Sequence, residues 1–195
     1  MPPAGLDLRT RLIDATEAVM RRDGPLTVRI DEVARLAGCS RATVYRHVAD
    51  KDELVRLVLV RLAEARAGEM ADDLARIADP GTRIAEGLVR TVEAVRGEWW
   101  YAALARHGST AAVARIGGGP RAFVALTSPL VAPFLELLAA DGWLRPGVTV
   151  ADATEWLCVV SVGLLSMDAT GDRGRAEQVA FLRRFVADAL LRRPA

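Results

Sequence analysis

The stretch LTVRIDEVARLAGCSRATVYRHVADKDELV, residues 26–55, contains two short helical patterns separated by a turn. In the first pattern Ala34 supplies a small residue at which a second helix can cross, and Gly38 supplies a turn residue that tolerates positive φ. Ser40 is a candidate N-cap for the second helix, expected at 41–48. Two helices joined in this way predict a helix-turn-helix motif, which inserts the N-terminal end of its second helix into the major groove of DNA.

The ends and the inner faces of these helices are also predicted from the stretch. Thr27 is a candidate N-cap for the first of the two helices. Asp50 and Glu53 are spaced as in a capping box, which predicts the start of a long helix that ends near Ala78. A small apolar core is expected between the two helices of the motif, formed by Val33, Ala37, Cys39 and Val44.

Most of the remaining chain is predicted to be helical, because no segment shows the alternation of a strand. A first helix starts at Leu8 and ends at Asp23-Gly24-Pro25. Gly117 to Pro120 is predicted to be a flexible break, and Pro129 and Pro133 are predicted to bend or divide their helix. Further helices are expected at 84–95, from Glu98 through the Trp99–Tyr101 cluster, and at 121–140, 151–170 and 175–192. The sequence therefore predicts an all-α fold.

The positive charge of the chain is local. The net charge over 195 residues is only +1. Between residues 35 and 51, however, Asp50 is the single acidic side chain among four basic ones, which are Arg35, Arg41, Arg46 and Lys51. Lys51 is the only lysine in the chain and falls in the first turn of a predicted helix, where the helix dipole favours an anion. This pattern favours a small docking surface for a polyanion, and an ordinary solvated helix surface is the alternative.

The side-chain types divide the predicted DNA-binding residues by task. The two arginines of the second helix suit guanine, because their planar fork matches two acceptors on one base, and Thr43 suits a base edge or a thymine methyl group. Tyr45 and His47 suit phosphate oxygens. Lys51 would share a phosphate with the backbone N–H groups at a helix start. The full predicted set is Thr27, Ser40, Arg41, Ala42, Thr43, Tyr45, Arg46, His47 and Lys51.

Residues from about Leu8 to Leu57 resemble the DNA-binding domain of the TetR family of bacterial transcriptional regulators. Val48 stands where the family usually has an aromatic residue, and Cys39 stands where it usually has an aliphatic one. Over Gly81–Ala195 the resemblance is limited to length, helical content and a dimer-like final pair of helices. The matching features are a helix ahead of the motif and the residues Thr27, Ala34, Gly38, Ser40, Thr43, Tyr45, Lys51 and Leu54.

The resemblance implies a homodimer that binds a palindromic operator on double-stranded DNA, usually as a repressor, and that a small-molecule effector releases. It implies a helix-turn-helix DNA-binding domain over 1–50, a connecting long helix over 51–80, and a helical ligand-binding and dimerisation domain over 81–195. A pocket for a small, largely apolar effector needs apolar walls and a few polar groups. Candidates of suitable type are Trp100, Leu104, His107, Phe123, Thr127, Trp156 and Val160. The alternative for each aromatic residue is a place in the core.

The last two predicted helices have more apolar surface than one core needs. Residues 156–167 are apolar almost all round. The final helix has one apolar line through Val179, Leu182, Val186 and Leu190, and a second through Phe181, Phe185 and Ala189. One line can face the core of the domain while the other faces a second copy of the chain. The predicted dimer interface consists of Leu157, Ser161, Leu164, Phe181, Phe185 and Ala189; the alternative is a monomer whose core takes both lines.

Other classes of function have little support. Cys39 and Cys158 lie far apart, and the cysteines and histidines show no metal-ligand spacing, so no metal, cofactor or enzymatic activity is expected. The first seven residues hold no signal-peptide core, and the apolar run at 156–167 is too short to span a bilayer. We therefore expect a reduced, cytoplasmic protein. A DNA-binding dimer without a ligand and a helical enzyme are the alternatives to a ligand-responsive regulator.

Overall fold

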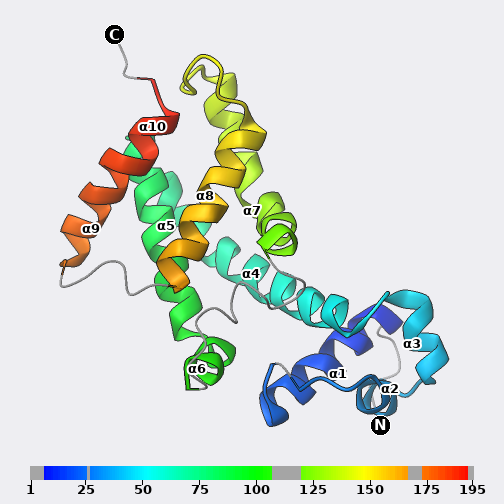
Figure 1. Ribbon diagram of the computed structural model, residues 1–195. Helices are drawn as coiled ribbons and strands as arrows, with labels where there is room; N and C mark the ends of the chain where they lie inside the picture. The colour runs from blue at the N-terminus through cyan, green and yellow to red at the C-terminus, as the bar shows by residue number, and fades with distance from the viewer. Residues whose placement is uncertain (1–6, 26, 107–119, 167–172, 193–195) are drawn as a thin grey trace. The chain divides into compact units, whose positions relative to one another are not determined.

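The computed structural model of the chain describes residues 7–25, 27–106, 120–166 and 173–192. Within these residues the only β-type pairing is an isolated bridge between Leu144 and Leu191. The helices, coloured along the chain in Figure 1, are α1 Leu8–Asp23, α2 Ile30–Ala37, α3 Arg41–His47, α4 Lys51–Ala75, α5 Pro80–Gly97, α6 Trp99–Arg106, α7 Pro120–Ala140, α8 Val150–Ser166, α9 Arg175–Leu182, the π-helical turn η2 Arg183–Ala187, and α10 Asp188–Leu190. The predicted all-α fold is confirmed. None of the described helices is long and apolar enough to cross a membrane.

The chain forms two compact units. Unit 1 comprises Met1–Ala63 and Glu98–Phe123, and unit 2 comprises Glu64–Gly97 and Val124–Ala195. Of the three divisions, one lies between α5 and α6 and the other two fall inside α4 and inside α7, so each of these two helices contributes to both units. The boundaries expected from the sequence, at residues 50 and 80, lie instead near the two ends of α4. Compactness thus assigns the first half of α4 to the same unit as the three N-terminal helices.

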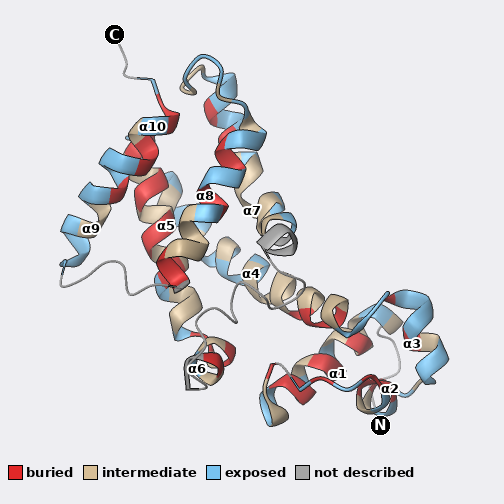
Figure 2. Cartoon of the chain, in the orientation of Figure 1, coloured by how far each residue is buried: buried red, intermediate tan, exposed pale blue. Residues whose placement is uncertain are grey.

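The core of unit 1 includes the inner faces of α1, α2 and the start of α4, which are coloured red in Figure 2. The inner face of α1 consists of Leu12, Ala15, Val19 and Met20, each at most 6% exposed. Leu54, Val55 and Val58 are buried at the start of α4. Each large apolar side chain buried in this way stabilises the fold by roughly 1.5–3 kcal/mol. This core packs against the inner side of the helix-turn-helix motif and holds its helices in place.

The start of α2 differs from the prediction. This helix begins at Ile30 with Arg29 as its N-cap, so the prediction that Thr27 caps it is wrong. The hydroxyl of Thr27 donates instead to the carbonyl oxygens of Asp23 and Gly24, at 2.7 and 2.8 Å. The backbone N–H of Thr27 also points to Gly24 O, at 3.2 Å. A tight turn after α1 therefore uses both donors of Thr27.

Two other helix boundaries also differ. α4 ends at Ala75 and not near Ala78. α7 is one uninterrupted helix that includes Pro129 and Pro133, so of the two predicted effects of these prolines, to bend or to divide it, division does not occur. The ribbon of α7 changes direction along its length (Figure 1), in agreement with the predicted bend. Of the predicted flexible break at 117–120, residues 117–119 lie outside the described residues, and Pro120 is the first residue of α7.

In unit 2, α5 contacts α8, α9 and η2. Its buried face includes Ile84, Leu88 and Val92, the residues whose spacing predicted it. The two apolar lines of the last helical segment separate as expected. Leu182, Val186 and Leu190 are at most 5% exposed, whereas Phe181 and Phe185 are 40% and 57% exposed. One line therefore completes the core of the unit, and the other is left at its surface.

Candidate nucleic-acid interface

The turn between α2 and α3 has the backbone geometry that the sequence predicted. Gly38 ends α2 in the left-handed conformation, with φ 67° and ψ 39°. Its N–H and that of Cys39 bond to carbonyls in the last turn of α2, and Cys39 N lies 3.0 Å from Ala34 O. The left-handed residue reverses the chain at low cost because glycine has no Cβ to clash. The turn thereby directs the chain into α3.

α3 is anchored by one residue and capped by another. Val44 is fully buried, and it is joined in the small core by Val33 and Ala37, which are at most 1% exposed. Cys39 is half-buried and contributes less to this core than expected. Ser40 caps α3, since its side-chain oxygen accepts the N–H of Thr43 at 3.1 Å. The predicted cap is confirmed.

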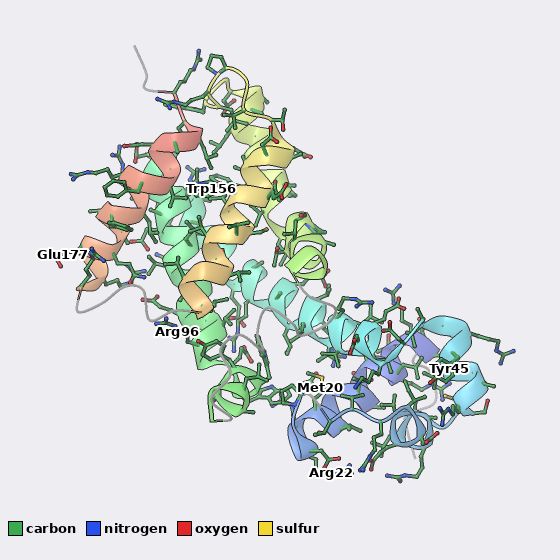
Figure 3. All side chains as sticks on the ribbon, viewed as in Figure 1. Met20, Arg22, Tyr45, Arg96, Trp156 and Glu177 are labelled. Atoms are coloured by element: carbon green, nitrogen blue, oxygen red, sulfur yellow. The ribbon has the colours of Figure 1, made fainter. Side chains whose placement is uncertain are left out.

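The opposite side of α3 is a polar surface. Arg41, Ala42, Tyr45, Arg46 and His47 are exposed, and Thr43 is partly exposed. Tyr45, labelled in Figure 3, is 46% exposed, a large fraction for an aromatic side chain. The burial pattern places the predicted base-reading and phosphate-binding residues of α3 on one solvent-facing surface. We call the exposed residues of 41–47 the α3 surface.

The guanidinium of Arg41 has two partners. Its Nη1 lies 3.0 and 3.2 Å from the two carboxylate oxygens of Asp31, on α2. Its Cζ lies 5.6 Å from the centre of the Tyr45 ring, within the range of a cation–π contact. The interaction with Tyr45 and the charge of Asp31 both raise the pKa of Arg41, so the guanidinium stays charged. Sequence reasoning missed Asp31, because it lies outside α3 and has the wrong charge for DNA.

Thr43 connects several polar groups of the α3 surface. Its hydroxyl lies 2.9 Å from Ser40 Oγ and accepts from Arg46 Nη2 at 3.1 Å. Its carbonyl oxygen lies 3.0 Å from His47 Nδ1. These contacts orient the Arg46 and His47 side chains before any partner is present. The second nitrogen of His47 is left to face solvent or a phosphate.

The start of α4 has the hydrogen bonds of a capping box, shifted by one residue at its outer end. Asp50 Oδ1 accepts the N–H of Glu53 at 2.7 Å, and Glu53 Oε2 accepts the N–H of Ala49 at 2.6 Å. Lys51 is exposed in the first helical turn beside these groups. The cap uses the Ala49 and Glu53 donors internally. A phosphate at this helix start would therefore meet Lys51 and the remaining N–H groups of the first turn.

The positive charges around the motif are partly neutralised. Glu32 accepts from Arg22 at 2.7 Å, and it also pairs with Arg29 and Arg35. The hydrogen bond from Arg22 holds the pKa of Glu32 below its usual value. Among the four basic residues of 35–51, Arg46 and Lys51 make no ion pair within the described part of the chain. These two side chains can therefore bind an acceptor group of DNA without first breaking an ion pair with a carboxylate.

The predicted pocket residues belong to different units. Trp100 and Leu104, on α6 in unit 1, are 7% and 2% exposed. In unit 2, Thr127 Oγ1 lies 2.9 Å from Cys158 Sγ, and Trp156 is 41% exposed. The remaining candidates are Val160, which is half-buried on α8, His107, which lies outside the described residues, and Phe123, whose side chain is not described.

Two indole N–H groups in unit 1, those of Trp99 and Trp100, are buried and have no hydrogen-bond partner among the residues that the structure describes. A buried donor without a partner is costly, so polar groups of this kind often mark a binding site. Trp100 was proposed from the sequence for its residue type, and the sequence contains no signal for an unpaired N–H. Within the described residues no cluster of three or more histidine, cysteine or acidic side chains could hold a metal ion.

The predicted dimer residues separate into two groups. Leu157 and Leu164 are 5% and 8% exposed within unit 2, so each has little surface to offer a partner chain. Ser161 is half-buried and donates to Leu157 O at 2.8 Å. The large exposed apolar side chains of these helices are Trp156 and Val159 on α8, with Phe181 and Phe185 on the final helical segment, where the predicted residue Ala189 is exposed too. Residues 156–167 have no polar side that would indicate which face of α8 is exposed. For this reason Val159 was not predicted to lie at the surface.

Comparisons with known proteins agree with this geometry. Residues 12–58 match the model of the bacterial regulatory proteins of the tetR family. Over 177 residues the chain is 29% identical to an uncharacterised HTH-type transcriptional regulator of Mycobacterium tuberculosis, covering 90% of this chain and 82% of that protein. It resembles the structure of RolR in complex with resorcinol, with a TM-score of 0.66 and 18% identity over 95% of each chain. It also resembles Thermus thermophilus FadR, a TetR-family transcriptional repressor in complex with lauroyl-CoA, with a TM-score of 0.62 and 20% identity over 96% of this chain and 97% of that chain.

The matched residues 12–58 contain α2, the Gly38 turn and α3, the parts from which the interface is built. The curated relative is similar over most of both chains, and the solved structures share the fold beyond the N-terminal helices. Residues 12–58 of this chain thus match the DNA-binding domain of the tetR family of bacterial regulatory proteins.

Proposed function

We propose that the chain is a repressor that binds a palindromic operator as a homodimer and is released by a small, largely apolar molecule. The observation that supports this most directly is the α3 surface. Val44 fixes one side of α3 to the core, while Arg41, Thr43 and Arg46 are presented on the other. A helix held in this way has the polarity required to enter a major groove.

The DNA contacts divide between reading and positioning. Arg41 and Arg46 suit guanine, whose O6 and N7 accept a bidentate fork. Tyr45, His47 and Lys51 suit phosphates, which set the register of the helix on the duplex. Thr27 is a weaker candidate than the sequence suggested, because both its donors are used in its own turn.

Dimerisation is supported by the exposed apolar side chains of unit 2. The rings of Phe181 and Phe185 contact each other with their centres 4.8 Å apart and their planes tilted by 46°, and both are substantially exposed. Trp156 and Val159 on α8 are also exposed. A two-fold interface through α8 and the final helical segment would cover them. The resulting dimer would present two α3 helices, which need a spacing of roughly 34–36 Å to fit successive major grooves.

Release by an effector requires a route from unit 2 to α3. α4 is the natural candidate, because it contributes to both units. Its residue Arg61 pairs with Asp14 and Glu17 of α1, so a displacement of α4 would be passed to the N-terminal helices. Converting a population from 1:99 to 99:1 takes about 5.5 kcal/mol of differential binding. An apolar molecule that buries roughly 200 Å² more in one state supplies most of this.

The similar structures support a small-molecule effector without identifying it. RolR binds resorcinol and the Thermus FadR binds lauroyl-CoA, so chains of this fold accept both an aromatic compound and an acyl chain. The unpaired indole N–H groups of Trp99 and Trp100 favour an effector that has a hydrogen-bond acceptor as well as apolar surface.

The test is selection of DNA from a random library by the purified protein, repeated with panels of phenols and of acyl-CoA thioesters. We expect an inverted repeat to be enriched, and one panel member to reduce its binding while raising the melting temperature. Enrichment without symmetry would remove the dimeric operator. Enrichment that no compound affects, with no thermal shift, would favour a DNA-binding dimer without a ligand.

A further inference from the structure

Asp31 is the one acidic side chain that forms an ion pair with the α3 surface, among the residues that the structure describes. A carboxylate next to a DNA-binding surface repels phosphates, so it weakens binding to every sequence alike. It gives little stability in return. The side chains of Asp31 and Arg41 are 73% and 59% exposed, and exposed ion pairs contribute little to folding.

The geometry of the pair suggests what the carboxylate does. Both oxygens of Asp31 face Nη1 of Arg41, at 3.0 and 3.2 Å, while the Tyr45 ring lies 5.6 Å from the guanidinium carbon. Arg41 is therefore held from α2 and from the next turn of α3 together. Only one of its terminal nitrogens is used by Asp31, and arginine has five N–H donors in a fixed plane. Nη2 and Nε make no contact with Asp31, and they are the pair of donors that matches the two acceptors of a guanine.

We propose that Asp31 is a positioning residue for sequence specificity, which holds the Arg41 guanidinium for a base edge and keeps it from binding phosphates. The proposal rests on the proposed function, because it requires α3 to read base pairs. An arginine without this partner would be a flexible cation that finds the nearest phosphate. Such a contact adds affinity for every sequence and no discrimination. Asp31 lowers this affinity for all sequences, and it fixes the orientation of the Arg41 guanidinium before DNA binds. The specific contact then costs less conformational entropy.

The experiment compares Asp31→Asn with the parent protein and with Glu64→Gln. The control removes one negative charge from an exposed position on α4, outside the motif. After an operator has been selected by the parent, fluorescence anisotropy gives Kd for the operator, for operators with single base-pair changes and for unrelated DNA, each over a salt series. Circular dichroism melts verify that the variants are folded.

We expect Asp31→Asn to bind unrelated DNA several-fold more tightly, with a salt slope steeper by about one unit, because Arg41 gains a phosphate contact. At one base-pair position of each half-site it should lose about tenfold in discrimination, the order expected for one arginine–guanine contact. Glu64→Gln should leave this discrimination unchanged. In an Arg41→Ala background, Asp31→Asn should cause no further loss, because the residue that it positions is absent.

Other outcomes overturn the proposal. Unchanged discrimination in Asp31→Asn, or an equal loss with and without Arg41, would show that Asp31 does not act through this arginine. An equal loss at all base-pair positions with a lower melting temperature would assign Asp31 a structural role. If the parent selects no sequence, the proposed function fails and this proposal fails with it. If the parent selects an operator that Asp31→Asn reads equally well, only this proposal fails.

Discussion

Arg183 donates from Nε to Oδ2 of Asp79 at 3.0 Å, across 104 residues of sequence. Asp79 directly precedes Pro80, the first residue of α5, and the same Oδ2 accepts the N–H of Thr82 at 2.7 Å, as in an N-cap. One carboxylate thus caps α5 and joins the final helical segment to it. The hydrogen bond from Arg183, with those from Thr82, lowers the pKa of Asp79 to about 2.

The first prediction concerns the charge of Asp79. Asp79→Asn keeps an oxygen for the cap and removes the ion pair. Because the folded-state pKa is about 2 and the ordinary value is 3.8, the charge stabilises the fold above about pH 4, and this contribution disappears as the pH falls through about 2. The pair is half exposed, so the effect at neutral pH is up to about 1 kcal/mol. Thermal melts across this pH range should converge for the two proteins, and a difference independent of pH would contradict the assignment.

Local signals in the sequence were sufficient to predict the DNA-binding motif. Gly38 and Ser40 have roles that depend on residues within four positions of them, and both roles are confirmed. Thr27 had an equally good local signal and failed, because a turn after α1 offered its hydroxyl two carbonyl acceptors. N-cap and turn roles use the same atoms, so residue type alone cannot distinguish them.

Contacts between distant residues limited the prediction of the sites. The pair of Asp31 and Arg41 joins two helices, and nothing in the spacing indicates it. The apolar run on α8 does not indicate which side of the helix is exposed. Leu157 was therefore assigned to the outside although it is buried, and Val159 was missed although it is exposed. On the final helical segment the two separate apolar lines distinguished the buried side from the exposed side, and Phe185 was placed correctly at the surface.

The second prediction concerns Gly38, whose φ of 67° disfavours any residue with a Cβ. Gly38→Ala should destabilise the protein by about 1–2 kcal/mol and weaken operator binding, because the turn orients α3. Gly68→Ala is the matched control. A Cβ at Gly68 meets nothing within 4 Å, and alanine in the middle of α4 should stabilise by roughly 0.5–1 kcal/mol. Urea unfolding measures both, and the same sign for the two variants would refute the argument.

The third prediction concerns Lys51. Lys51→Ala should weaken binding to operator and unrelated DNA by similar factors, and it should flatten the dependence of log Kd on log salt concentration by about 0.9, the value for one phosphate contact. Arg66→Ala removes an exposed cation farther along α4 and should change neither quantity. Unaltered affinity and slope in Lys51→Ala would exclude the phosphate contact, and a loss confined to one base-pair change would indicate base reading instead.

The fourth prediction concerns the exposed aromatic pair of unit 2. Phe185 is 57% exposed and contacts the tilted ring of Phe181. A partner chain that covers Phe185 would lose a large apolar contact in Phe185→Glu and would bury an unpaired carboxylate. Replacing a central interface aromatic costs about 2 kcal/mol or more, which raises the dimer Kd at least about thirtyfold.

Ala180→Glu is the control for Phe185→Glu, because Ala180 is exposed and lies outside the line of Phe181, Phe185 and Ala189. Sedimentation velocity over a concentration series should find Phe185→Glu dissociating at concentrations where Ala180→Glu and the parent remain dimeric. A folded Phe185→Glu that sediments like the parent would place the two-fold interface elsewhere. Operator binding adds an independent reading, since a protein that reaches DNA only as a dimer should lose affinity in proportion to its dissociation.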